Sequence, residues 1–254
     1  MALEEFRFLE SAYNDAFFNM GLDEAVLDSV AYGARPTLRL YAWEPKAVSI
    51  GYFQGLKDEV DEAACKAIGV DVVRRLTGGG AVYHADELTY SIIVPEKHPL
   101  AGKSILESYK NLSAGLIKGL EELGINAFFA PLNDICWQDK KISGNAQTRR
   151  KGCILQHGTL LLSVNAEEMF SLLKVPNEKL KDKVIESVKA RVGSVSDILG
   201  RGISYKEAAL AAETGFRAVL GSLGKKEEAT GLELENAKKS AVNRFQNTEW
   251  TKRR

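Results

Sequence analysis

The stretch RRLTGGGAVYH at residues 74–84 limits the possible local structure of this chain more than any other segment. An apolar run through Val70, Val72 and Val73 leads into two arginines, and three consecutive glycines follow. Glycines, which lack Cβ atoms, let backbone N–H groups approach an anion closely. The guanidiniums offer paired donors to phosphate or carboxylate. The stretch therefore predicts a strand followed by a glycine-rich turn that binds an anion, with a phosphorylated ligand favoured.

The residues around this turn exclude two common phosphate-binding loops. No Gly-Lys-Ser/Thr follows the glycines, so the stretch is not a Walker A loop. Residues 81–84 and 88–94 have the pattern of strands, whereas the P-loop and the Rossmann fingerprint place phosphate at a helix N-terminus. A plain hairpin turn without a ligand is the alternative that the glycines alone leave open.

Composition limits the cellular setting and the partners. Lys plus Arg and Asp plus Glu both number 34, so the zero net charge gives no overall attraction to nucleic acid. The N-terminus has no basic-then-apolar signal pattern, and no apolar run reaches the roughly 18–20 residues of a membrane span. Three widely spaced cysteines, Cys65, Cys136 and Cys153, suggest reduced thiols. We expect a cytoplasmic protein that binds neither nucleic acid nor membrane.

Hydrophobic periodicity predicts an α+β fold. Helices are expected at 15–31, 60–68, 104–123, 166–173, 178–188, 205–220 and 232–245. Strands are expected at 37–41, 47–52, 70–75, 81–84, 88–94, 125–129, 135–138, 141–143 and 154–164, with a hairpin turn at Asp139-Lys140. Strands cluster in the first two-thirds and helices in the last third. This order favours mixed or antiparallel β-sheets with packed helices.

Two further motifs lie downstream of the glycine-rich stretch. Asn133-Asp134-Ile135 precedes KISGNAQ at 141–147, where Lys141 opens a strand after a tight turn. A lysine held in this way is a point charge for a carboxylate or phosphate oxygen, and Gly144 and Ala146 would keep the surface beside it open. HGTLL at 157–161 places a histidine in an apolar strand. An exposed turn lysine, an Asn-Asp turn and a structural histidine are the ordinary alternatives.

Taken together, these motifs resemble the lipoate–protein ligases of the biotin/lipoate protein ligase superfamily. The resemblance rests on their joint order and spacing over most of residues 10–200. The segments that carry it are 74–84, 133–135, 141–147 and 157–161, with support from 19–24, 51–54, 174–180, Ser187 and 191–192.

The resemblance implies a biotin/lipoate ligase-like catalytic domain and an ATP-dependent lipoate–protein ligase. Such an enzyme converts lipoate and ATP to lipoyl-AMP and then transfers the lipoyl group to a lysine of a carrier domain. The expected partners are lipoyl domains of 2-oxoacid dehydrogenase E2 subunits or the glycine cleavage H protein. The expected cofactors are ATP and Mg2+, with lipoate as the substrate.

The resemblance also assigns roles to residues. Lys141 is the expected catalytic residue, bridging the acyl carboxylate and the α-phosphate where charge develops. Arg75 would neutralise triphosphate charge, and Asp134 is a candidate ligand for magnesium. The residues expected to bind substrate and nucleotide are Arg75, Gly78, Gly79, Gly80, Ala81, Val82, Tyr83, Asn133, Asp134, Lys141, Gly144, Ala146, His157 and Thr159.

The length of the chain departs from the long form of this family, which carries a C-terminal accessory domain. We expect residues 1–254 to form a single catalytic domain, with a helical C-terminal extension from about residue 200 and no accessory domain. The remaining residues are too few for a domain of ordinary size. A separate polypeptide is then expected to act in its place during adenylation.

Two other functions stay open at this point. An octanoyltransferase of the same fold would need no ATP and would take the acyl chain on a cysteine. Neither Cys136 nor Cys153 matches a known position for that thiol, and KVPNEK at 174–179 stands where one would be expected. A non-catalytic binding module is the third possibility, but it would not need Arg75, the glycines and Lys141 together. The choice between lipoate and octanoate is not resolved.

Overall fold

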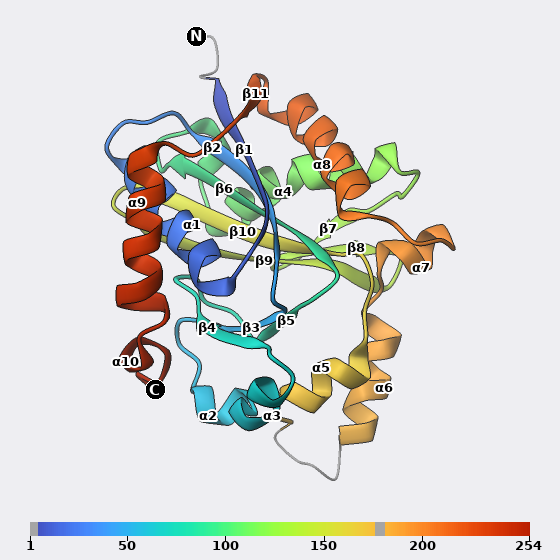
Figure 1. The fold of residues 1–254 in the computed structure, drawn as a ribbon. Helices are drawn as coiled ribbons and strands as arrows, with labels where there is room; N and C mark the ends of the chain where they lie inside the picture. Colours follow the sequence, from blue (N-terminus) through green and yellow to red (C-terminus); the bar gives the residue numbers. More distant parts are fainter. Residues whose placement is uncertain (1–4, 176–180) are drawn as a thin grey trace.

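The computed structural model describes residues 5–175 and 181–254, and within them it shows two β-sheets flanked by helices (Figure 1). The main sheet has the strand order β11-β1-β2-β6-β10-β9-β8-β7, and the smaller sheet has the order β4-β3-β5. Parallel and antiparallel pairs occur in both. The expected α+β class with mixed sheets is confirmed.

The strands of the main sheet come from distant parts of the chain. They are β1 (Phe6–Asn14), β2 (Thr37–Trp43), β6 (Glu87–Pro95), β7 (Phe128–Ala130), β8 (Asp134–Trp137), β9 (Lys140–Arg150), β10 (Cys153–Leu161) and β11 (Leu223–Glu227). The small sheet consists of β3 (Ala47–Ile50), β4 (Asp71–Arg74) and β5 (Val82–His84).

Helices cover both faces of the main sheet. Alternation along the strands sends Leu38 and Ile92 to the face covered by α4 (Ile105–Glu122) and α8 (Tyr205–Leu220). It sends Ile93 to the opposite face, where α1 (Ala16–Ala31) and α9 (Gly231–Ser240) pack. The sheet is therefore buried on two sides, and apolar side chains of its central strands pack against the helices on each side.

Shorter helices complete the fold around the small sheet and at the ends of longer elements. Apolar residues of α2 (Leu56–Glu59), α3 (Glu62–Ala67) and α5 (Ala166–Leu172) share one cluster with β3. The remaining elements are η1 (Pro99–Ala101), α6 (Lys181–Arg191), α7 (Val195–Leu199), η3 (Ala241–Phe245) and α10 (Thr248–Thr251).

The structure differs from the sequence-based elements in a few places. Strands β1 and β11 were not predicted, and they pair with each other in parallel across the length of the chain. The helix predicted at 60–68 is the short helix α3, and α2 before it was not predicted. The hairpin turn lies at Gln138-Asp139, one residue earlier than expected. Residues 178–180 of one predicted helix lie outside the described residues. From residue 200 onward the chain is helical except for β11.

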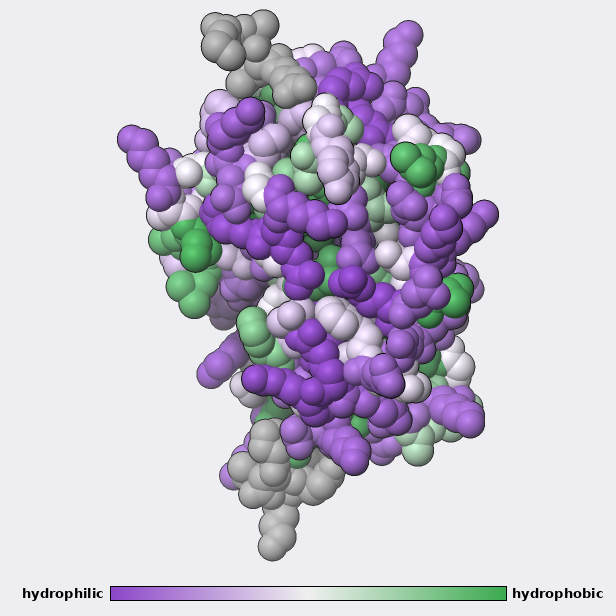
Figure 2. Space-filling view, turned by 90° about the vertical axis from the view of Figure 1, so that its left-hand side faces the viewer, coloured by the Kyte–Doolittle hydropathy of each residue, from purple (hydrophilic) through white to green (hydrophobic). Residues whose placement is uncertain are grey.

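Figure 2 shows the face that lies on the left of Figure 1, over α9 and the C-terminus. On this face hydrophobic residues form small separate areas among hydrophilic ones. Within residues 5–175 and 181–254, no helix combines the length and the apolar character that a bilayer crossing requires.

Candidate active site

One face of the main sheet forms the floor of a polar site. In register across the sheet, Ser91 of β6 lies between Arg39 of β2 and His157 of β10. One row along, Thr89 lies between Tyr41 and Thr159. Because residues two apart in a strand share a face, these rows point to the same side of the sheet as Ile93, beneath α1. The sheet register thus gathers polar side chains from three strands.

A β-bulge brings Lys141 to this face. Strand β8 pairs Ile135 with Ser143 and Cys136 with Lys141, so Ile142 is an extra residue in β9. A bulge shifts the alternation of side chains by one position. The Lys141 ammonium consequently extends over Gly144, where an added Cβ would lie 2.9 Å from Nζ. The backbone of Lys141 is held by Gly193, whose N–H donates to the Lys141 carbonyl at 2.9 Å.

Two adjoining pockets meet at Lys141. The first is lined by Tyr41, Trp43, Ser49, Arg75, Gly79, Gly80, Val82, His84, Thr89, Asn133, Lys141, Gly144, Asn145, Ala146, His157, Gly158 and Thr159. The second lies towards α5 and α6 and includes Lys46, Tyr83, Glu87, Leu161, Met169 and Val188. Val82, Lys141, Gly144 and Thr159 line both. A group held by Lys141 would therefore be accessible from either pocket.

Lys141 is paired with a carboxylate in this structure. Its Nζ lies 2.7 Å from Oδ1 of Asp134, and both side chains are partly exposed, at 41% and 31%. Ion pairs with this exposure contribute little to stability. The ammonium is therefore available to exchange Asp134 for a ligand oxygen.

Arg75 holds the glycine-rich loop. Its guanidinium donates to the carbonyls of Ser49 at 2.9 Å and of Gly78 and Gly80 at 3.0 Å. It also donates to two hydroxyls, Ser49 Oγ at 2.8 Å and Thr77 Oγ1 at 3.3 Å. The side chain is buried, which lowers its pKa to about 10, so that it still carries charge at neutral pH. These contacts tie the loop to β3.

Arg74, the other arginine of the motif, points away from the pockets. It donates to the carbonyls of Gly51 and Gln54 at 3.0 and 2.7 Å and to that of Thr251 at 2.8 Å. These contacts fasten the C-terminal segment to the loop after β3. Of the two guanidiniums, only Arg75 therefore belongs to the candidate site.

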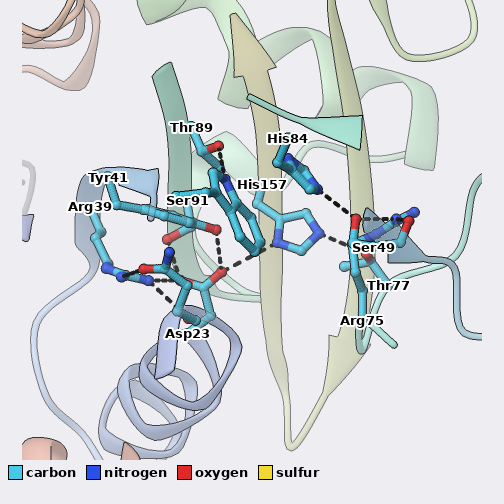
Figure 3. Close-up of polar contacts among 12 residues, drawn as sticks. Asp23, Arg39, Tyr41, Ser49, Arg75, Thr77, His84, Thr89, Ser91 and His157 are labelled. Carbon is cyan, nitrogen blue, oxygen red and sulfur yellow. Dashed lines mark hydrogen bonds and ion pairs between the residues drawn. The ribbon is translucent and has the colours of Figure 1, made fainter. Parts of the chain in front are cut away.

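A first histidine relay connects α1 to the loop (Figure 3). His157 lies between Asp23, 3.3 Å from its Nδ1, and Thr77, whose Oγ1 is 2.7 Å from Nε2. Asp23 also accepts from Arg39, Tyr41 and Ser91. Burial lowers the pKa of His157, although the hydrogen bond with Asp23 opposes this. The imidazole is therefore neutral at physiological pH.

A second relay runs on the other side of Arg75. His84 lies between Ser49, whose Oγ is 2.6 Å from Nε2, and Glu87, whose Oε1 is 2.7 Å from Nδ1. Thr89 donates to the same Glu87 oxygen at 2.6 Å and accepts from Trp43 at 2.8 Å. Trp43 also stacks on the His84 ring, with centroids 4.0 Å apart. Both relays thus end on a hydroxyl that accepts a hydrogen bond from Arg75.

Most residues expected at the site are brought together. Those in the first pocket are Arg75, Gly79, Gly80, Val82, Asn133, Lys141, Gly144, Ala146, His157 and Thr159. Ala81 and Tyr83 line the second pocket, while Gly78 and Asp134 line neither. Gly78 contributes its carbonyl to Arg75, and Asp134 pairs with Lys141.

Several residues of the site were not predicted from the sequence. They are Asp23, Arg39, Tyr41, Trp43, Ser49, Thr77, His84, Glu87, Thr89 and Ser91. One signal was available: polar residues stand at every second position of β6, at Glu87, Thr89 and Ser91, in a strand that is otherwise apolar. Such alternation in a buried strand indicates a polar face.

The described residues include no group of three or more His, Cys, Asp or Glu side chains that could share a metal ion. None of the three cysteines lines either pocket. Cys65 and Cys153 are buried, whereas Cys136 is half-buried on β8 beside Lys141. Burial raises the pKa of the Cys136 thiol, Asp134 raises it further and Lys141 opposes them.

Residues 15–217 match the family model described as the lipoyl protein ligase A/B catalytic domain. The chain belongs to this family. It is therefore an enzyme of the lipoate ligase and transferase group, as the motifs at 74–84 and 141–147 indicated.

Among curated relatives, the chain is 37% identical to "Octanoyltransferase LipM" of Geobacillus kaustophilus, over the whole of both chains. It is 35% identical to the protein of the same name in Staphylococcus aureus, with 97% of this chain and 98% of the relative covered. Among solved structures, a bi-partite lipoate protein ligase from Thermoplasma acidophilum shares 31% identity at a TM-score of 0.87, covering 99% and 97% of the two chains. Lipoate-protein ligase A bound with ATP shares 29% identity at a TM-score of 0.85, covering 98% of each.

These relatives correct the function expected from the sequence. The ATP-dependent lipoate–protein ligase was the wrong choice, because relatives at 33–38% identity over nearly the whole chain are octanoyltransferases by name. The alternative, an octanoyltransferase of the same fold, fits them better. The contact expected between Arg75 and a triphosphate stays a prediction, and in this structure the guanidinium donates to the loop and to β3.

Proposed function

We propose that this chain transfers an octanoyl group from a thioester donor to a lysine ε-amine on a carrier domain of the lipoyl type. The observation that carries the proposal is the full-length similarity to octanoyltransferases, combined with a lysine at the junction of two pockets. A lipoyl domain is the proposed acceptor because the bi-partite ligase from Thermoplasma acidophilum is described with its E2 lipoyl domain.

The first pocket is the proposed site for the acyl chain. Tyr41, Trp43, Val82 and Ala146 contribute apolar surface, while hydrogen-bonding groups are concentrated at the loop and the relays. Ligand pockets commonly combine apolar walls with a few placed polar groups. The acyl carbonyl would then lie at Lys141, where the second pocket admits the acceptor amine.

The chemistry follows from the position of Lys141. The acceptor amine attacks the thioester carbonyl, a C–N bond forms, the C–S bond breaks, and the thiol leaves with the proton that the amine loses. Negative charge develops on the carbonyl oxygen, and a positioned ammonium stabilises it. The thioester is already activated, so the transfer requires no ATP.

The route without a cysteine intermediate is the one that the pocket linings support. Cys65 and Cys153 are buried and line neither pocket, and Cys136, which pairs with Lys141 across β8 and β9, lines neither pocket and has a raised pKa. A thiolate is the nucleophilic form of cysteine, and a raised pKa reduces its population at neutral pH. We therefore propose direct attack by the acceptor lysine.

The test uses the purified chain, octanoyl-acyl carrier protein and an apo lipoyl domain, without ATP. Mass spectrometry should show one octanoyl group added to the domain, and none on a domain whose target lysine is replaced by alanine. A parallel reaction supplies free octanoate or lipoate with ATP and Mg2+. Modification only in that second reaction would contradict the proposal.

A further inference from the structure

Glu87 carries a buried carboxylate oxygen that has no hydrogen-bond partner among the described residues. Oε1 accepts from His84 and Thr89, but Oε2 has none. The side chain is only 1% exposed, and the residue lines the second pocket. A buried carboxylate oxygen without a partner is costly. A ligand that donates to Oε2 would remove that cost.

The lysines that line the second pocket pair with carboxylates other than Glu87. Of the lysines that line the second pocket, Lys46 pairs with Glu168 at 3.0 Å and Lys141 pairs with Asp134 at 2.7 Å. Asp86, which also lines this pocket, adds a further negative charge near its wall. The described part of this pocket therefore favours a positively charged ligand group.

The relay on the other side engages only one oxygen of Glu87. Ser49 Oγ accepts a hydrogen bond from Arg75 at 2.8 Å, so its own proton is free to go to Nε2 of His84. With Nε2 engaged by that hydroxyl, Nδ1 of His84 is placed to donate to Oε1 of Glu87 at 2.7 Å. In this arrangement His84 orients the carboxylate, and Oε2 is left for a ligand.

We propose that Glu87 Oε2 binds the ε-ammonium of the acceptor lysine and removes its proton. This inference rests on the proposed function, because it requires an amine as the acyl acceptor. Glu87 and Lys141 line the same pocket, so a single occupant of that pocket is accessible to both. The opposite charges of the two residues suit opposite tasks: the carboxylate receives the amine, and the ammonium stabilises the oxyanion.

Every proton of the transfer has a stated acceptor. The carboxylate takes one proton from the ammonium, and the neutral amine forms the C–N bond to the acyl carbon. As the tetrahedral species collapses, the C–S bond breaks. The protonated Glu87 returns its proton to the departing thiolate, and the second amine proton is released to solvent as the amide forms. No oxidant, reductant or metal is needed.

The test compares Glu87→Gln and Glu87→Asp for octanoyl transfer to a lipoyl domain. Gln keeps the shape and the acceptor for His84 and Thr89 but loses the base, so the rate should fall roughly 10²- to 10⁴-fold. Asp keeps a carboxylate, although its side chain is one methylene shorter. The Glu87→Asp chain should therefore retain more activity than the Glu87→Gln chain. Glu121→Gln, which removes a charge from an exposed pair with Lys118, is the matched control and should behave as wild type.

A second acceptor separates catalysis from structure. The target lysine of the lipoyl domain is replaced by cysteine and aminoethylated, which gives a less basic amine of nearly the same length. Because this amine is more often unprotonated, Glu87→Gln should lose less activity with it than with lysine. Circular dichroism melting of each variant monitors folding.

Three results would overturn the inference. One is a Glu87→Gln chain as active as wild type, and another is a Glu87→Asp chain slower than Glu87→Gln, which would indicate a purely structural role. The third is the same loss with both acceptors. A wild-type chain that transfers no octanoyl group would instead overturn the proposed function, so the two failures are distinguishable.

Discussion

The Lys141 ammonium and the Asp134 carboxylate lie 2.7 Å apart across strands β9 and β8, at the junction of the two pockets. The contact is an ion pair without hydrogen-bond geometry. Lys141 lines both pockets, whereas Asp134 lines neither. Asp134 therefore neutralises the Lys141 ammonium from outside the pockets. A substrate oxygen has to displace the Asp134 carboxylate before it can bind to the ammonium.

Lys141→Ala should reduce octanoyl transfer by roughly 10²- to 10³-fold, because removing one positioned group that stabilises an oxyanion has this effect. The melting temperature should stay near that of wild type, since the side chain is partly exposed. Lys140→Ala removes the neighbouring lysine, which lines neither pocket, and should keep its activity. A Lys141→Ala chain with normal transfer rates would show that the residue is not catalytic.

Gly144→Ala tests the position of the ammonium without removing it. The new Cβ would lie 2.9 Å from Nζ and Cε of Lys141, and the flexible end of that side chain would move aside. Stability should change little, while transfer should fall by up to ~10²-fold because the cation is misplaced. Gly202→Ala meets nothing within 4 Å and serves as the control. Unchanged transfer in Gly144→Ala would mean that the path of the Lys141 side chain over Gly144 has no role in the reaction.

Cys136→Ser should retain octanoyl transfer within about threefold of wild type. The physical reason is that the thiol lines neither pocket and burial raises its pKa, which disfavours the thiolate. Initial rates with octanoyl-acyl carrier protein are the measurement, and Cys65→Ser and Cys153→Ser are run beside it. Loss of activity in Cys136→Ser, together with an octanoyl thioester trapped on wild type, would replace direct attack by a cysteine route.

Stability should fall as the pH drops below about 6.5, in part through His157. Burial lowers the pKa of this imidazole below its ordinary value of 6.5 in the folded chain, so the unfolded chain takes up a proton first. Binding of protons to the unfolded state destabilises the fold, and stability therefore rises with pH between the folded and unfolded pKa. As the pH is lowered from 7.5 to 5, the melting temperature of the His157→Gln chain should decline less steeply than that of wild type. An identical slope would remove His157 from this explanation.

Gly215→Ala should destabilise the fold through the contact of α8 with α4. Its Cβ would lie 2.1 Å from the Gly119 backbone nitrogen and 2.2 Å from the Gly115 carbonyl oxygen. Overpacking of this kind costs about 1–3 kcal/mol, which exceeds the gain of up to ~1 kcal/mol from better helix propensity. Urea unfolding is the measurement, and Gly202→Ala is again the control. A Gly215→Ala chain more stable than wild type would mean that α4 and α8 can move apart at little cost and accommodate the added methyl group.

The local pattern was sufficient for most elements and for the family. The helical stripe of residues 104–123 became α4, and the glycine-rich stretch became a loop between β4 and β5. Strand β11 was missed because it has the sequence LGKKE and is mostly exposed, so only its pairing with β1 makes it a strand. The prediction of a single domain over residues 1–254 stays a prediction, although that pairing supports it.

The α+β class, the family, and the lysine and loop at the centre of the site could be predicted from residue types and their spacing within short segments. That Arg75 holds the loop, and that Glu87 has an oxygen without a partner among the described residues in a pocket, became visible only in the folded chain. The fold also placed Asp23 of α1 against His157 of β10. The physical reason is that burial and hydrogen-bond partners arise from strands and helices far apart in the chain, and no local pattern records them.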